Sequence, residues 1–266
     1  MSPDPQAPAD IDVEQPSAAR VHDYMLGGKD NYDVDRMAAD QILAVAPEMG
    51  EVAVENRRFL VRTVRSLTKQ GHDQFLDLGS GLPTRENVHE VAQAANPDAR
   101  VVYVDRDPMV LSHARALLGA GPDTIDYVHA DVRDPAAVLD APRTRKVLDF
   151  SRPVVVLFVA VLHFVADEDD PAGLVRRYVE ALPSGSRVVI ACGSSDHLSE
   201  TIKEKVRQYF TDVPSPLRLR PRARIAELFG DLPLEEPGLV HVTDWPSPGH
   251  GKRLPMTSFG GVAHVP

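Results

Sequence analysis

Residues 75–81 read FLDLGSG, and residues 101–107 read VVYVDRD. Each stretch is a short apolar run that stops abruptly, the first at a Gly-Ser-Gly turn and the second at Asp105. Two buried strands that end in this way, roughly 25 positions apart, are typical of a nucleotide pocket in an α/β fold. The glycines let the backbone approach a ligand closely, because they carry no Cβ. Asp105 can accept hydrogen bonds from two ribose hydroxyls, which suits an unphosphorylated adenosine.

The amino-acid sequence of the first turn distinguishes between two adenosine-containing ligands. A dinucleotide site needs a third glycine, but Thr84 stands in that position. Asp77 lies within the strand end, where it would repel a pyrophosphate but tolerate a ligand with a cationic centre. The pattern therefore favours S-adenosylmethionine (SAM) over NAD. We expect Gly79, Ser80 and Gly81 along its methionine part and Asp77 near its amino group.

A third short apolar run, IDYVHAD at residues 125–131, also ends in an acid. Asp131 can accept a hydrogen bond from an adenine amino group, and the amide of Val132 can face the ring. Arg106, which follows the expected ribose acceptor Asp105, is assigned to the same site. These residues complete a predicted cofactor pocket along the ends of three neighbouring strands.

Taken together, these stretches resemble class I SAM-dependent methyltransferases, and within them the actinobacterial family once described as a domain of unknown function. The resemblance covers roughly residues 17–265. It implies SAM as the cofactor and a Rossmann-like α/β fold, with a seven-stranded, mostly parallel sheet, helices on both faces and an N-terminal helical cap. It leaves the methyl acceptor unassigned. It rests on RVHDYMLGGKDNYDVDR (20–36), FLDLGSGLPTRENVHEVAQ (75–93), VVYVDRDPMVLSHARALL (101–118), HADVRDP (129–135) and VAVLHFVAD (159–167).

Composition restricts the partners and the compartment. The chain has 266 residues and a net charge of −10, which disfavours non-specific binding to nucleic acid or to an anionic membrane. It has neither a run of 18 apolar residues nor a signal-peptide pattern, so we expect a cytoplasmic protein with no membrane span. The lone Cys192 excludes an intrachain disulfide, and the ten histidines show no ligand pair at helical spacing, so no metal is expected. Four arginines at 217–224 are interpreted as a solvated loop.

The pattern along the chain divides it into three parts. Residues 1–16 hold four prolines, four acids and no base, which is typical of a disordered tail. Residues 17–70 are predicted to form a helical cap and residues 71–266 a SAM-binding methyltransferase domain. The first predicted cap helix covers 18–26 and is capped by Ser17. The second is capped by Asp33 and runs to about Val45, and the third lies in 49–69. Asp107 should cap the helix after the second strand, and further strands are predicted at 153–162, 187–192, 239–245 and 258–265.

The segment RVHDYMLGGKDN at residues 20–31 crowds charged side chains around a double glycine. It fails the pattern of a phosphate-binding loop. One interpretation is a helix end with solvated charges. The other is a lid over SAM, with Arg20 or Lys29 on the carboxylate, Gly28 beside the cofactor and Tyr24 on the reaction face, because methyl transfer gains from exclusion of water.

His163 follows the predicted central strand, whose end should face the methyl group. A neutral histidine there can accept a proton from an oxygen, nitrogen or sulfur nucleophile, or it can simply pack beside the methionine chain. Catalysis would come mostly from alignment for direct displacement, with a small molecule as the expected acceptor. The alternatives are a non-catalytic SAM-binding regulator and an NAD-dependent oxidoreductase.

Overall fold

A computed structural model describes residues 11–83, 86–118, 123–209, 217–247, 254 and 256–266. Seven strands form one sheet in the order β3-β2-β1-β4-β5-β7-β6. The first five are parallel, and β7 runs antiparallel to both β5 and β6. The predicted Rossmann-like α/β architecture of class I methyltransferases is confirmed. The strands are β1 (Gln74–Leu78), β2 (Arg100–Asp105), β3 (Ile125–His129), β4 (Val155–Val159), β5 (Arg187–Gly193), β6 (Val240–His241) and β7 (Ser258–His264).

The central strands are apolar on both sides because helices cover both faces of the sheet. One face packs on α3 (Met49–Lys69), α4 (Val88–Gln93) and α5 (Pro108–Leu118), with Phe75 and Leu157 among the buried residues. The other face packs on the helices that include α8 (Pro171–Val179) and α10 (Arg222–Glu227), with Leu76 and Phe158 in its core. The remaining short helices are α6 (Pro135–Leu139) and α7 (Pro142–Val147).

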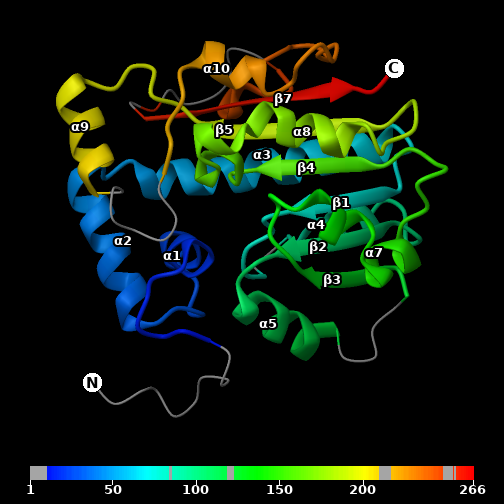
Figure 1. The fold of residues 1–266 in the computed structure, drawn as a ribbon, viewed down its shortest axis with the longest axis horizontal. Coiled ribbons are helices and arrows are strands. Elements are labelled where there is room, and N and C mark those ends of the chain that lie inside the picture. The colour runs from blue at the N-terminus through cyan, green and yellow to red at the C-terminus, as the bar shows by residue number, and fades with distance from the viewer. Residues whose placement is uncertain (1–10, 84–85, 119–122, 210–216, 248–253, 255) are drawn as a thin grey trace.

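Three helices gather beyond the carboxyl ends of the parallel strands. Figure 1 shows α1 (Ala18–Met25), α2 (Asp33–Val45) and α9 (Glu200–Tyr209) together at the left of the view. The third predicted cap helix, α3, instead runs along the sheet, where Phe59 and Leu60 enter the core of that face. The cap therefore stands over the strand ends, and α3 joins it to the sheet.

Two predicted helix caps are wrong. Ser17 occupies the N-cap position of α1, but its hydroxyl makes no cap hydrogen bond and donates to Asp107 instead. The cap of α2 is Tyr32 rather than Asp33, because Asp35 accepts a hydrogen bond from the Tyr32 amide. Asp107 does cap α5, since it accepts a hydrogen bond from the Met109 amide at 2.8 Å.

The expected disordered tail is too long. Residues 1–10 lie outside the described residues, but Ile11 is buried against the α3 face and Val13 packs on the same cluster. Burial of these two apolar side chains is favourable. The composition of residues 1–16, which is dominated by acids and prolines, does not reveal this pair.

The arginine-rich run at 217–224 is also not simply solvated. Arg220 is buried, and its guanidinium donates to the carbonyls of Leu162 and Val165 and to the carboxylate of Asp167. It therefore fastens the segment after β4, which carries His163. No helix among the described residues is long and apolar enough to cross a membrane.

Candidate functional site

A cavity of about 610 Å³ lies between the strand ends and the cap. Its lining has two parts that differ in chemistry. The strand half is lined by residues at or just after the carboxyl ends of β1, β2 and β3, namely Asp77, Gly79, Ser80, Gly81, Asp105, Arg106, Asp107, Asp131, Val132 and Arg133. The cap half is lined by His22, Met25, Ile42, Met49, Val52, Asn56, Phe164, Leu217, Leu219, Met256 and Ser258.

The turn after β1 adopts a conformation that glycine favours. Gly79 has φ +69°, and a Cβ there would overlap the side chain of Val161. Gly81 has φ +65°, and a Cβ there would project into open space. The amides of Gly79 and Ser80 both donate to the carbonyl of Val104, so the turn is tied to the neighbouring strand. Its backbone forms one wall of the cavity with no side chain in the way.

Asp105 is held in place by backbone amides on both sides. Its Oδ2 accepts from Gly81 at 2.8 Å, and its Oδ1 accepts from Asp107 at 3.0 Å. Burial raises the pKa of Asp105 above its usual range, against the effect of these hydrogen bonds. Each carboxylate oxygen has a further lone pair, so Asp105 can still accept from a ligand at the cavity wall.

Asp77 is a buried acid of β1, only 3% exposed, whose carboxyl group makes no hydrogen bond to a described residue. Burial raises its pKa to about 7, with Arg57 acting in the opposite direction and Asp105 adding to the rise. A buried carboxyl group without a partner is costly. The site therefore suits a ligand that brings a cationic or hydrogen-bond-donating group to Asp77.

Arg57 is the guanidinium that acts electrostatically on Asp77. It lies on α3, lines the cavity, and donates through Nη2 to the carbonyl of Glu86 and to Asn87 at the start of α4. Sequence reasoning missed Arg57. The available signal was polar residues at helical spacing inside an apolar stripe: Asn56 is buried among Val52, Ala53, Phe59 and Leu60.

Asp131 is already paired within the protein. It accepts three hydrogen bonds from Arg133, and Arg106 lies 3.7 Å away. Although burial opposes them, these contacts hold the pKa of Asp131 below its usual value. Val132 lines the cavity beside it. Part of the acceptor capacity expected for an adenine amino group is thus taken up by Arg133.

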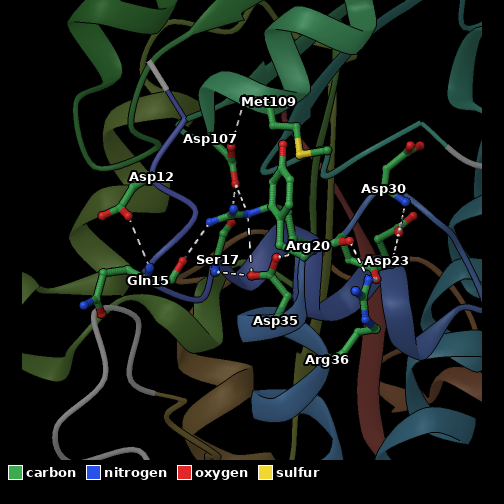
Figure 2. Close-up of polar contacts among 12 residues, drawn as sticks. Asp12, Gln15, Ser17, Arg20, Asp23, Asp30, Asp35, Arg36, Asp107 and Met109 are labelled. Atoms are coloured by element: carbon green, nitrogen blue, oxygen red, sulfur yellow. Dashed lines mark hydrogen bonds and ion pairs between the residues drawn. The ribbon is translucent and has the colours of Figure 1, made fainter. Parts of the chain in front are cut away.

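Arg20 joins the cap to the strand half through buried acids. Figure 2 shows its guanidinium between Asp35 and Asp107, with ion-pair distances of 3.6 and 3.5 Å. It also donates to the carbonyl of Gln15, whereas its Nη1 makes no hydrogen bond to a described residue. Arg20 therefore lies on the Asp107 side of the cavity and anchors α1 to the turn that carries Asp105.

Tyr24, Gly28 and Lys29, which are also assigned to the lid, do not line the cavity. Tyr24 donates to Asp40 on α2, Lys29 is exposed, and Gly28 packs directly against Asp23. Asp23 accepts from the Asp30 amide and from Asn31 (Figure 2). The double glycine thus folds onto Asp23, as the helix-end interpretation expects. Tyr24, Gly28 and Lys29 therefore lie outside the lining of the cavity.

His163 and His22 both face the cavity, and both are neutral at pH 7. Burial lowers the pKa of His163 to about 3 and that of His22 to about 4, with Arg57 adding to the second effect. The Nδ1 atom of His163 accepts from the Gly193 amide at 3.3 Å, so its neutral ring carries the proton on Nε2. His163 is therefore arranged to donate, whereas Nε2 of His22 has no partner among the described residues.

The described residues include no group of three or more His, Cys, Asp or Glu side chains that could hold a metal ion. Cys192 is buried in β5, and burial raises the pKa of its thiol to about 11. It therefore belongs to the core of the sheet rather than to the cavity.

Comparisons with known proteins agree with this geometry. A family model described as S-adenosyl methyltransferase matches residues 4–266. A DUF574 family protein from Streptomyces avermitilis is 41% identical, with 96% of this chain and 99% of that chain covered and a TM-score of 0.90. A putative methyltransferase from Thermobifida fusca is 40% identical, with 98% and 99% covered and a TM-score of 0.90.

More distant structures share only the fold. An O-methyltransferase family protein from Burkholderia thailandensis is 14% identical over 88% of this chain and 60% of that one, with a TM-score of 0.53. No curated protein matches the chain.

Proposed function

The chain belongs to the S-adenosyl methyltransferase family, and on that premise we propose that its cavity binds SAM in the strand half and a small methyl acceptor in the cap half. It is a SAM-dependent methyltransferase. The observation that supports this division is the lining itself: charged residues and a glycine turn lie along the strand ends, and an apolar surface lies under the cap. The cavity volume is in the range of small-molecule sites.

The strand half fits the adenosine and methionine parts of SAM. Asp105 accepts hydrogen bonds from the ribose hydroxyls, and the Gly79–Gly81 turn lets the backbone contact the methionine chain. The Val132 amide and Asp131 border the adenine, and Arg106 closes the outer edge. Asp77 holds the amino group, which gives this buried acid a hydrogen-bonded cationic partner in addition to the electrostatic effect of Arg57.

Arg57 is our proposed ligand for the SAM carboxylate, in place of Arg20 or Lys29. It lies close enough to Asp77 to act on its charge, whereas Arg20 is paired with two carboxylates near the ribose side. A guanidinium binds a carboxylate strongly because it can offer two parallel donors.

The chain contributes to methyl transfer mainly through position and exclusion of water. When bound, SAM supplies an electrophilic methyl group on a sulfonium. The turn after β1 and Asp77 fix the methionine chain, and the Val161–Phe164 segment forms the wall at the junction of the two halves. Alignment of a nucleophile with the S–CH₃ bond can account for most of the rate enhancement.

Calorimetric titration with SAM, S-adenosylhomocysteine and NAD tests the proposed site. We expect both adenosyl ligands to bind, NAD not to bind, and Asp105→Asn to weaken adenosyl binding by about tenfold or more, because hydrogen bonds to a charged acceptor are lost. Asp98→Ala, an exposed acid before β2, is the matched control and should bind normally.

Two outcomes would count against the proposal. If Asp105→Asn left the affinity for both adenosyl ligands unchanged, the cofactor would bind elsewhere in the molecule. Binding of SAM without methylation of any compound in a metabolite panel would instead favour the regulatory alternative.

A further inference from the structure

The cap half of the cavity is apolar and separate from the two cores of the sheet. Its apolar lining belongs to a third cluster, formed where α1, α2 and α9 meet. Three of its lining residues are methionines, whose flexible side chains adapt to irregular ligands. This surface therefore suits a largely apolar molecule. The lining residues of this cluster are Val21, Met25, Ile42, Met49, Val52, Phe164, Leu217, Leu219 and Met256.

The cap half also lacks negative charge. Among the described residues, the acids that line the cavity are Asp12, Asp77, Asp105, Asp107 and Asp131. They lie in the N-terminal segment or at the ends of β1, β2 and β3. No acid from α1, α2, α3 or β7 joins them. A cationic ligand would thus lose its hydration in the cap half without gaining a partner.

Three buried polar atoms in the cap half have no hydrogen-bond partner among the described residues. They are Nε2 of His22, Oδ1 of Asn56 and Oγ of Ser258. Asn56 is 5% exposed and Ser258 is fully buried. Leaving such buried groups unpaired is energetically costly. The amide oxygen of Asn56 only accepts, and Nε2 of a neutral His22 accepts in the tautomer that carries its proton on Nδ1, so in this tautomer the missing partner of both atoms is a hydrogen-bond donor.

The fold brings these residues to the same region. Ser258 pairs with Gly193 in the register of β5 and β7, and the Gly193 amide donates to His163. His22 is close enough to His163 to lower its pKa. On α3, Asn56 precedes Phe59 by about one turn, and the Phe59 ring lies where a Cβ on Gly260 would meet it.

We propose that the methyl acceptor is an uncharged, largely apolar molecule that carries a hydroxyl group, and that the single O–H of this group donates a bifurcated hydrogen bond to Oδ1 of Asn56 and Nε2 of His22. This inference rests on the proposed function, because it assigns the substrate class of the same cavity. His163, with its proton on Nε2, supplies a donor to the hydroxyl oxygen.

The corresponding reaction balances without a further reagent. An O–CH₃ bond forms as the S–CH₃ bond breaks, and the electron pair of the broken bond stays on sulfur. The hydroxyl proton passes to Nε2 of His22 and then to solvent. His22 is available as an acceptor because burial and Arg57 keep it neutral at pH 7.

Three compounds with one skeleton test the inference. 4-Propylphenol carries the donor and no charge, 4-propylanisole lacks the donor, and tyramine replaces the terminal methyl group with an ammonium. Each is titrated calorimetrically into the protein saturated with S-adenosylhomocysteine. We expect 4-propylphenol to bind about tenfold more tightly than either analogue. 4-Propylanisole loses the donated hydrogen bond, and tyramine buries an ammonium group without a partner.

Two variants on the same helix sharpen the test. Asn56→Leu should remove the preference for 4-propylphenol over 4-propylanisole. Thr63→Val is the matched control, because Thr63 is another buried, unpartnered residue of α3 that does not line the cavity. It should leave the preference unchanged.

The outcomes separate this inference from the proposed function. If S-adenosylhomocysteine itself fails to bind, the proposed function fails. If it binds but 4-propylphenol does not, or if tyramine binds as tightly, the assigned substrate class is wrong. Equal binding of the phenol and the anisole to the wild type, or an equal effect of Thr63→Val, would overturn the role of Asn56.

Discussion

The strand half and the cap half of the cavity are built in different ways. In the strand half, backbone amides position the functional groups: Asp105 is held by Gly81 and Asp107, and the glycine turn is tied to Val104. In the cap half, side chains from α1, α3 and β7 meet, and three of their polar atoms remain unpaired among the described residues. One half is preorganised, whereas the other is completed by what binds there.

This difference shows how a single fold can retain one cofactor while it binds different methyl acceptors. Backbone geometry in the strand half leaves little freedom for substitution, because glycines at positive φ and buried acids depend on one another. The apolar cap half can change by exchanging side chains of similar volume, which packed clusters tolerate well.

The largest expected effect is at the turn of the strand half. Gly79→Ala should lower the free energy of unfolding by about 2–4 kcal/mol, because its Cβ meets Val161 in addition to the cost of positive φ. Gly27→Ala, at φ +78° with no atom near the added Cβ, should cost only about 1–2 kcal/mol. Urea denaturation of both variants measures the difference. Equal losses would show that Val161 does not enforce the glycine.

The next effect concerns Arg57, which lines the cavity and acts on the charge of Asp77. Arg57→Met should weaken S-adenosylhomocysteine binding by about 10- to 100-fold, which corresponds to the loss of about 1.5–3 kcal/mol from a charged hydrogen-bonded pair. Arg58→Met is the matched control, since Arg58 is exposed and paired with Glu55. Calorimetry on the two variants checks this. If both variants changed S-adenosylhomocysteine affinity equally little, Arg20 would replace Arg57 as the proposed ligand of the cofactor carboxylate.

The sequence predicts the strand half well because its signals are local. A strand end, a Gly-x-Gly turn and an acid follow one another within a few residues, and the sheet order brings their ends together. Asp77, Gly79, Ser80, Gly81, Asp105, Arg106, Asp131 and Val132 accordingly all line one cavity.

The sequence predicts the cap half poorly because its contacts join distant segments. The partner of Tyr24 is Asp40 on the next helix, and Arg20 pairs with Asp107, which lies far along the chain. No local pattern distinguishes Arg20, which enters the cavity, from Lys29, which faces solvent. Asn56 and Arg57 are equally hidden, because a polar residue in an amphipathic helix gives no sign of which neighbour it meets.

A smaller effect, dependent on pH, tests the partner of Asp77. Its pKa of about 7 in the unliganded protein means that a cationic amino group must displace the proton below that pH. Affinity for S-adenosylhomocysteine should therefore fall by up to about tenfold per pH unit below 7. Asp77→Asn should bind weakly but with little of this pH dependence, as calorimetry at pH 5.5, about 6.5 and about 7.5 would measure.

The same carboxyl group should affect stability in the opposite direction. Its pKa is raised from 3.8 in the folded state, so between these values the folded chain binds more protons than the unfolded chain. Stability of the unliganded protein should therefore decrease by up to about 1.4 kcal/mol per pH unit as the pH rises towards 7, relative to Asp77→Asn. Parallel pH profiles of the two proteins would contradict the burial of a neutral acid.

The smallest expected effect lies in the segment that resembles a lid. Tyr24→Phe and Lys29→Ala should each change S-adenosylhomocysteine affinity by less than about twofold, because surface contacts of this kind contribute little. Tyr24 reaches only Asp40, and Lys29 is exposed. Arg20→Met, one helical turn before Tyr24, should weaken binding measurably because it unpairs Asp35 and Asp107. If Tyr24 or Lys29 proved as important as Arg20, the double-glycine segment would have to close over the cofactor in a second conformation, and the cap half would then be preorganised only after SAM has bound.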